Sequence, residues 1–179
     1  MRPAPFVFLI CLAETLSMTG TMYFPALLPS LQAEWGLTNT EAGWINGVFF
    51  AGYAVTAPFL VGFTDRIDAR RIYLPSAALA ALSLLLFGWL AEGTWSAAAL
   101  RLLAGIGLAG TYMPGLRALS DNVSGPKQSR HIVFYTATYG IGTALSVYFA
   151  GLLAPLIGWQ PGAEHLSRGP LAALLPFAA

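Results

Sequence analysis

Charged residues are scarce in this sequence of 179 amino acids. Asp, Glu, Lys and Arg together make up 9% of the chain, whereas they make up about 25% of an ordinary soluble domain. Hydrophobic residues make up 56%. A water-soluble protein with so few charges could not cover its surface, so the composition excludes a soluble globular domain. The net charge of +1 gives no electrostatic reason to expect a nucleic-acid partner.

Cysteine and clusters of metal-ligating or catalytic side chains are also scarce. The single cysteine, Cys11, cannot form an intramolecular disulfide. His131 borders a predicted span and His165 falls in a predicted outer loop, so the two histidines do not suggest a metal site. Neither a pair of aspartates nor a Ser–His pair lies at predicted membrane depth. We therefore expect no metal, no cofactor and no enzymatic activity.

Long apolar blocks dominate the sequence and predict an all-α membrane protein, a polytopic helix bundle. A helix needs about 20 apolar residues to cross the hydrocarbon core of a bilayer. Blocks of this length predict complete transmembrane helices at residues 6–28, 43–63, 72–91, 95–116 and 132–157. A further apolar stretch, 169–179, is too short to cross.

These lengths also suggest how the chain is organised. We expect residues 1–160 to form an amino-terminal bundle, and 161–179 to form a divergent outer loop followed by the truncated start of a sixth helix. The unusual composition of 161–168 would reflect either a shifted reading frame or a divergent loop. On this hypothesis the chain is part of a longer protein.

Basic residues gather on one side of the predicted spans. Arg2, the loop at 64–71 and the loop before the fifth span hold most of the Lys and Arg, whereas the opposite loops contain only Arg168. Because cytoplasmic loops are enriched in Lys and Arg, we predict that the N-terminus and the 64–71 loop are cytoplasmic, in a bacterial-type inner membrane. On the outer side, Thr38 and Glu41 fit a capping box that starts the second span.

The loop between the second and third spans contains four charged residues of special interest, Asp65, Arg66, Arg70 and Arg71. The stretch 61–71 resembles the G-x-L-A-D-R-x-G-R-R signature of the major facilitator superfamily of transporters. Gly62 falls one residue late and Asp68 replaces the second glycine, so the copy is divergent. The resemblance implies that the four residues form a charge network that gates a conformational change. Anchoring of a cytoplasmic loop by positive charge alone is the alternative.

The fourth predicted span carries a second resemblance to this superfamily. Its stretch 101–110 is similar to the family motif R-x-x-x-G-x-G, with Arg101 followed by Gly105, Gly107 and Gly110. Such glycines would let a neighbouring helix approach closely. An arginine at membrane depth is unfavourable by about 2.5–3.5 kcal/mol, so Arg101 should face a polar interior, with Tyr112 on the same helical face. Arg101 would contact an anionic substrate or a coupling charge, or else bind backbone carbonyls of neighbouring helices.

Three more polar residues at membrane depth are candidates for a substrate or proton-coupling site. Glu14, well inside the first span, could carry a proton, pair with Arg101 or form a purely structural ion pair. Asn46 in the second span and Tyr139 in the fifth lie on polar helix faces. These faces either line a cavity or pack against other helices.

The two resemblances predict the amino-terminal half of a major-facilitator transporter. A complete transporter of this kind would move a small solute by alternating access, coupled to protons. Its partners would be the lipid bilayer, protons, a small molecule such as an organic anion, and a missing carboxy-terminal half or a second copy of the chain. The alternatives are a half-transporter that works as a homodimer and a non-transporting membrane fragment.

Overall fold

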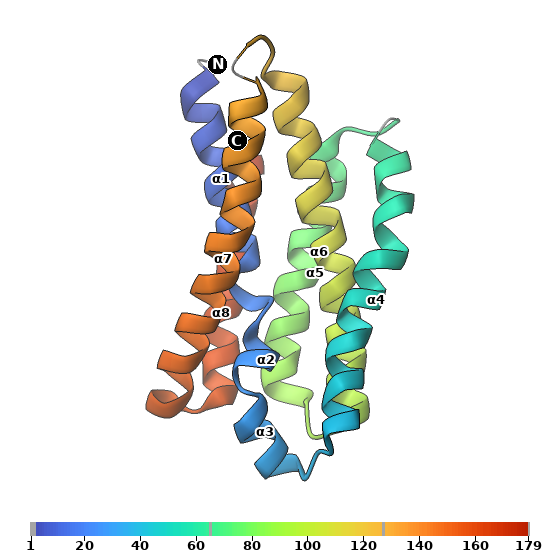
Figure 1. The fold of residues 1–179 in the computed structure, drawn as a ribbon, viewed down its shortest axis with the longest axis vertical. Coiled ribbons are helices and arrows are strands. Elements are labelled where there is room, and N and C mark those ends of the chain that lie inside the picture. The colour runs from blue at the N-terminus through green and yellow to red at the C-terminus, as the bar shows by residue number, and fades with distance from the viewer. Residues whose placement is uncertain (1–2, 65, 127, 179) are drawn as a thin grey trace.

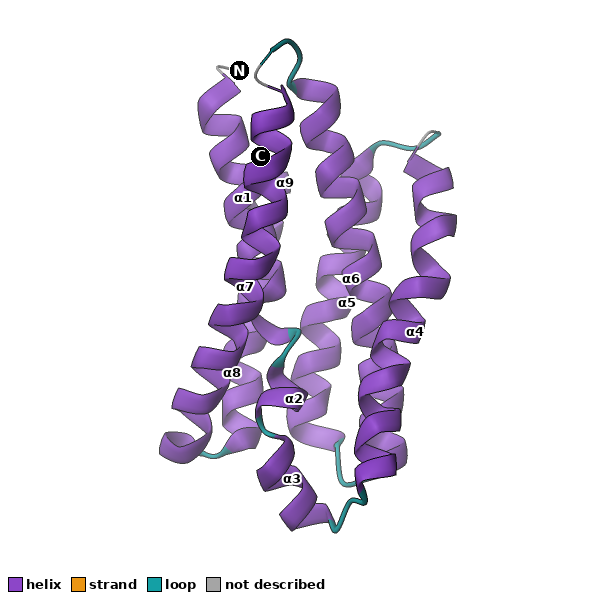
Figure 2. Ribbon diagram, viewed as in Figure 1, coloured by secondary structure: helices purple, strands orange, loops and turns teal. Residues whose placement is uncertain are grey.

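The structure is a computed structural model that describes residues 3–64, 66–126 and 128–178. This part of the chain consists of helices joined by short turns, with no strand among the described residues (Figure 2). The elements are, in chain order, α1 (Pro3–Ser17), the 3₁₀ helix η1 (Met18–Gly20), α2 (Tyr23–Ala26), α3 (Leu28–Trp35), α4 (Asn39–Thr64), α5 (Ala69–Leu90), α6 (Thr94–Asn122), α7 (Gln128–Ile157), α8 (Trp159–Ala172) and α9 (Leu174–Ala178).

Four of the described helices, α4, α5, α6 and α7, are long and apolar enough to cross a membrane. They contain 26, 22, 29 and 30 residues. Since a helix rises about 1.5 Å per residue, each one exceeds the roughly 30 Å of the hydrocarbon core. Each corresponds to one of the predicted spans. The prediction of an all-α membrane bundle is therefore confirmed.

The first predicted span, 6–28, is not one continuous helix. It begins as α1, narrows to η1 and continues after a turn as the short helices α2 and α3. Pro25 and Pro29 lie in this second part, and proline removes a backbone donor and clashes with the preceding helical turn. The segment also runs further than predicted, because α3 ends only at Trp35, where Gly36 takes a left-handed conformation with φ of 63°.

The end of the chain is helical where we expected a loop. Residues 161–168 belong to α8, and 169–172 continue the same helix. Gly158, with φ of 89°, lets the chain reverse directly between α7 and α8, so no longer loop is needed. The helix has one buried face, which includes Ala163 and Leu166, and an exposed face that carries Glu164 and Arg168. Its charged residues Glu164 and Arg168 thus lie on one side of a helix.

Figure 1 shows the helices running up and down a single bundle. α6 packs against α4 and α5, α8 packs against α5 and α7, and α1 packs against α7. The N-terminal end of α1 and the turns after α4 and α6 lie at one end of the bundle, drawn at the top. At the other end, Trp35 and Trp159 pack edge to face with ring centroids 5.4 Å apart, beside Phe87.

Candidate functional site

The break in the first span leaves polar backbone groups inside the bundle, and side chains from two other helices bind them. Pro25 lacks an N–H, so the carbonyl of Thr21, four residues earlier, has no helical donor. Nη1 of Arg101, in α6, donates a hydrogen bond to this carbonyl over 2.8 Å. The N–H of Met22 donates to Oγ of Ser146, in α7, over 3.0 Å. Arg101 and Ser146 therefore stabilise the discontinuous helix.

Arg101 is a buried cation with neutral partners. Arg101 is only 4% exposed. Its Nη2 donates a hydrogen bond to Oδ1 of Asn46 over 3.1 Å. The guanidinium carbon lies 4.1 Å from the ring centroid of Phe49 and 5.8 Å from that of Phe24, within the range of cation–π attraction. Its Nε has no hydrogen-bond partner among the residues that the structure describes. Among the described residues, Arg101 forms no ion pair with a carboxylate.

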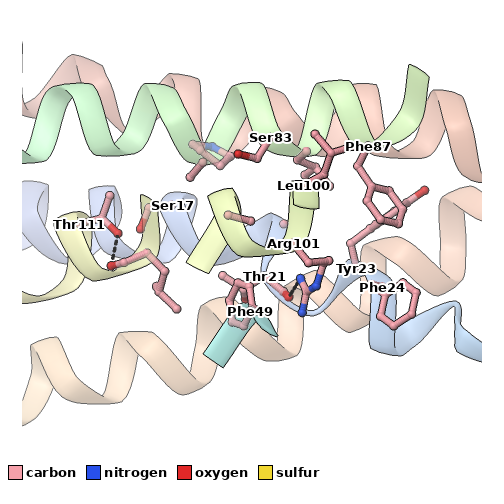
Figure 3. Close-up of a pocket in the computed structure, with 16 residues that line it drawn as sticks. Ser17, Thr21, Tyr23, Phe24, Phe49, Ser83, Phe87, Leu100, Arg101 and Thr111 are labelled. Carbon is pink, nitrogen blue, oxygen red and sulfur yellow. Dashed lines mark hydrogen bonds between the residues drawn. The ribbon is translucent and has the colours of Figure 1, made fainter. Parts of the chain in front are cut away.

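A small cavity lies beside Arg101 (Figure 3). Its volume is about 30 Å³, and its polar wall includes Ser17, Ser83 and Thr111. A cavity needs roughly 10–15 Å³ to hold one water molecule. This space therefore suits ordered water rather than an organic substrate.

Glu14 lies near the end of α1 and is 1% exposed. The hydroxyl of Tyr135, in α7, lies 3.0 Å from its Oε2, and the hydroxyl of Ser17 lies 3.5 Å from the same oxygen. In the described part of the chain, Oε1 of Glu14 has no hydrogen-bond partner. The structure does not pair Glu14 with Arg101, because the hydrogen bonds of Arg101 go to a backbone carbonyl and to Asn46.

Two larger pockets lie near Arg101 and the small cavity. The one we call the tyrosine pocket has a volume of about 260 Å³ and is lined by Phe50, Tyr53, Leu108, Tyr112, Thr136 and Tyr139. It brings together two predicted site residues, since the ring centroids of Tyr112 and Tyr139 are 5.6 Å apart. The second pocket, of about 210 Å³, is lined in part by Asn46. Leu108 lines both the tyrosine pocket and the small cavity, and Asn46, which lines the second pocket, accepts a hydrogen bond from Arg101.

The glycines of the fourth span lie where other helices approach closely. A Cβ atom at Gly105 would collide with the main chain of α4 at Phe49. One at Gly107 would lie 2.9 Å from the carbonyl oxygen of Ser76 in α5, and one at Gly110 would collide with the Ser76 side chain. Gly105 and Gly107 thus lie where another backbone packs against α6, and Gly110 lies where the Ser76 side chain does.

The arginine loop lies at the end of the bundle where α4 and α5 meet (Figure 1). Asp65 falls outside the described residues, and Arg66, Arg70 and Arg71 are exposed. Asp68, which replaces a glycine of the family signature, caps α5, because its Oδ1 accepts a hydrogen bond from the N–H of Arg70 over 2.8 Å. The departure from the signature thus has a local structural role.

We did not select Thr21, Ser146 or Tyr135 as site residues from the sequence. A signal for Thr21 is present, because a proline four residues later frees its carbonyl. Tyr135 and Ser146 lie on the same polar face of the fifth span as Tyr139, a signal that marks the face but not the role of either residue. Their roles depend on which helix packs against α1, which the sequence pattern does not specify.

The comparison with known proteins identifies the family. Residues 10–163 match the model of the Major Facilitator Superfamily. The match covers most of the chain, and the chain belongs to this superfamily. The apolar helices and the family together identify an integral membrane protein of a transporter family, not of an enzyme family.

Several curated relatives are named as transporters. The chain is 26% identical to the niacin transporter NiaP of Acinetobacter baylyi over 79% of its own length and 32% of that protein. It is 26% identical to the benzoate transport protein of the same organism, over 97% of the chain and 39% of the relative. It is 29% identical to the gallate transporter of Pseudomonas putida, over 84% and 33%. The chain thus spans about a third of the length of these relatives.

Proposed function

We propose that this chain is part of a secondary transporter that moves a small organic anion by alternating access, coupled to protons. The observation that carries the proposal is the burial of Arg101 among neutral hydrogen-bond partners. Its guanidinium is buried, binds neutral groups and keeps Nε without a partner. A buried cation without a counter-ion is unfavourable, so an anion that reaches it is strongly attracted.

The break in the first span supports the same proposal. Secondary transporters commonly build substrate and ion sites from discontinuous helices near the membrane midplane. Here the break brings Arg101 between the carbonyl of Thr21 and the amide of Asn46. Because Asn46 also lines the 210 Å³ pocket, an anion in that pocket lies next to the partner of the guanidinium.

The names of the relatives narrow the class of substrate. Niacin, benzoate and gallate, for which three relatives are named, are all aromatic carboxylic acids. The rings of Phe24 and Phe49 lie beside Arg101 and offer aromatic surface next to a positive charge. We therefore propose an aromatic carboxylate whose charged group faces Arg101 and whose ring contacts Phe24, which also lines the 210 Å³ pocket.

Glu14 is the proposed carrier of the coupled proton. An ionisable side chain inside a membrane bundle is by default a functional candidate. Glu14 is buried, has one oxygen without a partner and makes no ion pair among the described residues. Proton uptake there removes a buried negative charge, which favours a different packing of the surrounding helices.

The remaining predictions on mechanism belong to the same proposal. Arg66, Arg70 and Arg71, together with Asp65, would form the gating network at the cytoplasmic end, in a bacterial-type inner membrane. The positive-inside distribution of Lys and Arg supports this orientation. Tyr112 and Tyr139 would contact substrate from the tyrosine pocket.

Uptake of radiolabelled benzoate into proteoliposomes that contain the full-length transporter tests the role of Arg101. Arg101→Ala should lower uptake about a hundredfold, because a hydrogen bond to a charged group contributes up to about 3 kcal/mol. Arg101→Lys keeps the charge but loses the planar fork, so intermediate uptake is expected. Arg168→Ala is the matched control, since that side chain is 65% exposed and should be dispensable.

Arg101 also holds the broken first span, so folding must be measured alongside transport. Each variant is heated in detergent, and its unfolding midpoint is compared with that of the wild type. A folded Arg101→Ala protein that takes up benzoate at the wild-type rate would contradict the proposal. Folded protein without uptake is the expected result.

A further inference from the structure

Tyr135 connects three helices inside the bundle. It belongs to α7 and its side chain is fully buried. Its hydroxyl oxygen lies 3.0 Å from Oε2 of Glu14 in α1 and 2.9 Å from the main-chain carbonyl oxygen of Tyr112 in α6. One hydroxyl group is therefore shared between a titratable carboxyl group and a backbone carbonyl.

A tyrosine hydroxyl has a single hydrogen, so these two contacts compete. When Glu14 is ionised, both neighbours are acceptors, and the charged carboxylate attracts the hydrogen more strongly. When Glu14 carries a proton on Oε2, it becomes a donor to the hydroxyl oxygen of Tyr135. The hydroxyl group of Tyr135 then donates its hydrogen bond to the main-chain carbonyl oxygen of Tyr112, and its O–H bond stays intact. Protonation thus reverses one hydrogen bond and strengthens another, and the only covalent bond that forms is the O–H bond of Glu14.

We propose that Tyr135 is a positioning residue that transmits the protonation state of Glu14 to α6. The inference rests on the proposed function, in which Glu14 carries the coupled proton. It adds the route by which the proton acts on the transporter. Ionised Glu14 holds the hydroxyl hydrogen of Tyr135 toward α1, and protonated Glu14 directs it to α6.

The receiving part of α6 can respond to such a change. Pro114 lies inside α6 two residues after Tyr112, and proline interrupts the ladder of helical hydrogen bonds. Gly115 faces the hydroxyl of Tyr135, and a Cβ atom there would collide with it. The rings of Tyr112 and Tyr135 pack with centroids 5.6 Å apart, and Tyr112 lines the tyrosine pocket. The hydrogen bond therefore acts on a weakened segment beside the pocket.

The surroundings of Glu14 leave this hydroxyl as its main polar partner. The titratable groups that interact with Glu14 and Tyr135 are one thiol and four phenols. They are Cys11 in α1, Tyr53 in α4, Tyr73 in α5, Tyr112 in α6 and Tyr139 in α7. Glu14 has no basic counter-ion among the residues that the structure describes. A change of charge at Glu14 therefore acts most directly on the hydrogen bond of Tyr135.

Amide hydrogen exchange of the purified chain in detergent tests the inference without any transport. In the wild type, protection of residues 112–116 should change with pH after correction for intrinsic exchange rates. Tyr135→Phe keeps the ring but removes the hydroxyl, so this dependence should disappear. Glu14→Gln donates a hydrogen bond as protonated Glu14 does, so its protection should stay at the low-pH level. Tyr148→Phe, in the same helix and 63% exposed, should behave as the wild type.

Either of two results would overturn the inference. One is a wild-type pH response in a folded Tyr135→Phe protein. The other is a wild-type pH response in Glu14→Gln, which does not depend on how well the tyrosine variant folds. Unfolding midpoints in detergent show whether each variant is folded.

Transport measurements separate this inference from the proposed function. Tyr135→Phe should slow proton-driven accumulation of benzoate about tenfold, within the range of ordinary coupling energies, while benzoate exchange without a proton gradient continues. If Glu14→Gln accumulates benzoate in a proton gradient at the wild-type rate, the proposed role of Glu14 as proton carrier is wrong. In that case the hydrogen-exchange result would still decide whether Tyr135 links Glu14 to α6.

Discussion

Arg101 binds a backbone carbonyl and an amide oxygen, and these partners allow it two roles at once. Nη1 satisfies the carbonyl of Thr21, which Pro25 leaves without a helical donor. Nε has no partner within the described ranges, and in the proposed function this is the nitrogen that an anion would contact. The structural and the substrate-binding interpretations of Arg101 are compatible because they use different atoms of the guanidinium.

The capping box at the start of α4 is a residue-scale prediction that the structure confirms. The N–H of Thr38 donates to Oε2 of Glu41 over 2.9 Å, and the N–H of Glu41 donates to Oγ1 of Thr38 over 3.2 Å. Thr38→Ala removes the hydroxyl that satisfies the first turn, so the free energy of unfolding should fall by about 1 kcal/mol. Denaturant titration in detergent measures this change. Thr40→Ala, at an exposed position two residues later, is the control and should change stability by less than about 0.5 kcal/mol.

Single residues of the site can be predicted from the sequence only in part. Arg101 and Glu14 attract attention because charged side chains are rare at membrane depth. Their partners Asn46 and Tyr135 lie 55 and 121 residues away in the chain. Contacts over such distances depend on how whole helices pack. Hydropathy and motif spacing carry no information about that packing.

At the scale of elements, α4 and α6 approach closely because each places a glycine against the backbone of the other. Gly105 of α6 faces the main chain of α4 at Phe49. Gly52 of α4 faces α6, where an added Cβ atom would lie 2.7 Å from the carbonyl oxygen of Leu102. Lipid tails are as apolar as helix surfaces, so van der Waals contact through small residues holds membrane helices together.

Two glycines of α4 provide a matched test of this packing. Gly52→Ala inserts a methyl group into the contact with α6 and should lower the free energy of unfolding by about 1–3 kcal/mol. Gly47→Ala makes the same change where a Cβ atom meets nothing within 4 Å, so stability should stay equal or rise through helix propensity. Unfolding in detergent compares the two variants. Equal effects would mean that Gly52 is not at a close contact.

The elements that follow from the sequence are those that contain a long hydrophobic run. The helices α4 to α7 coincide with long hydrophobic runs, and a span of that composition can satisfy its backbone only as a helix. The first span fails as one helix because hydropathy does not register the backbone effect of its prolines. The sequence predicts a loop at 161–168, where polar residues interrupt the apolar pattern, but these residues belong to α8, which has one buried face.

At the scale of the whole molecule, the helices run up and down the bundle, so the turns between them lie at two ends that differ in chemistry (Figure 1). The exposed Arg66, Arg70 and Arg71 lie at the end that also holds the beginning of α1 (Figure 1). The opposite end carries Glu92 and, in the core, the Trp35–Trp159 pair. This sorting could be predicted from the positions of Lys and Arg between apolar blocks. The order in which helices neighbour one another, with α6 between α4 and α5, could not.

Labelling of single cysteines in intact bacterial cells tests the proposed orientation. Cys11 is first replaced by Ala, and a single cysteine is then placed at an exposed position near either end, as Ile67→Cys or Glu92→Cys. A membrane-impermeant maleimide should label Glu92→Cys in intact cells, and should label Ile67→Cys only after the cells are permeabilised. The reverse pattern would place the arginine loop outside the cell.

The break in the first span also affects the order in which the molecule assembles. The carbonyl of Thr21 and the N–H of Met22 find their partners 80 and 124 residues further along the chain. Until α6 and α7 have entered the membrane, these groups must bind water or the insertion machinery, because lipid offers them nothing. The first span therefore reaches its final conformation only after the fifth span, which follows it in the chain, has been synthesised.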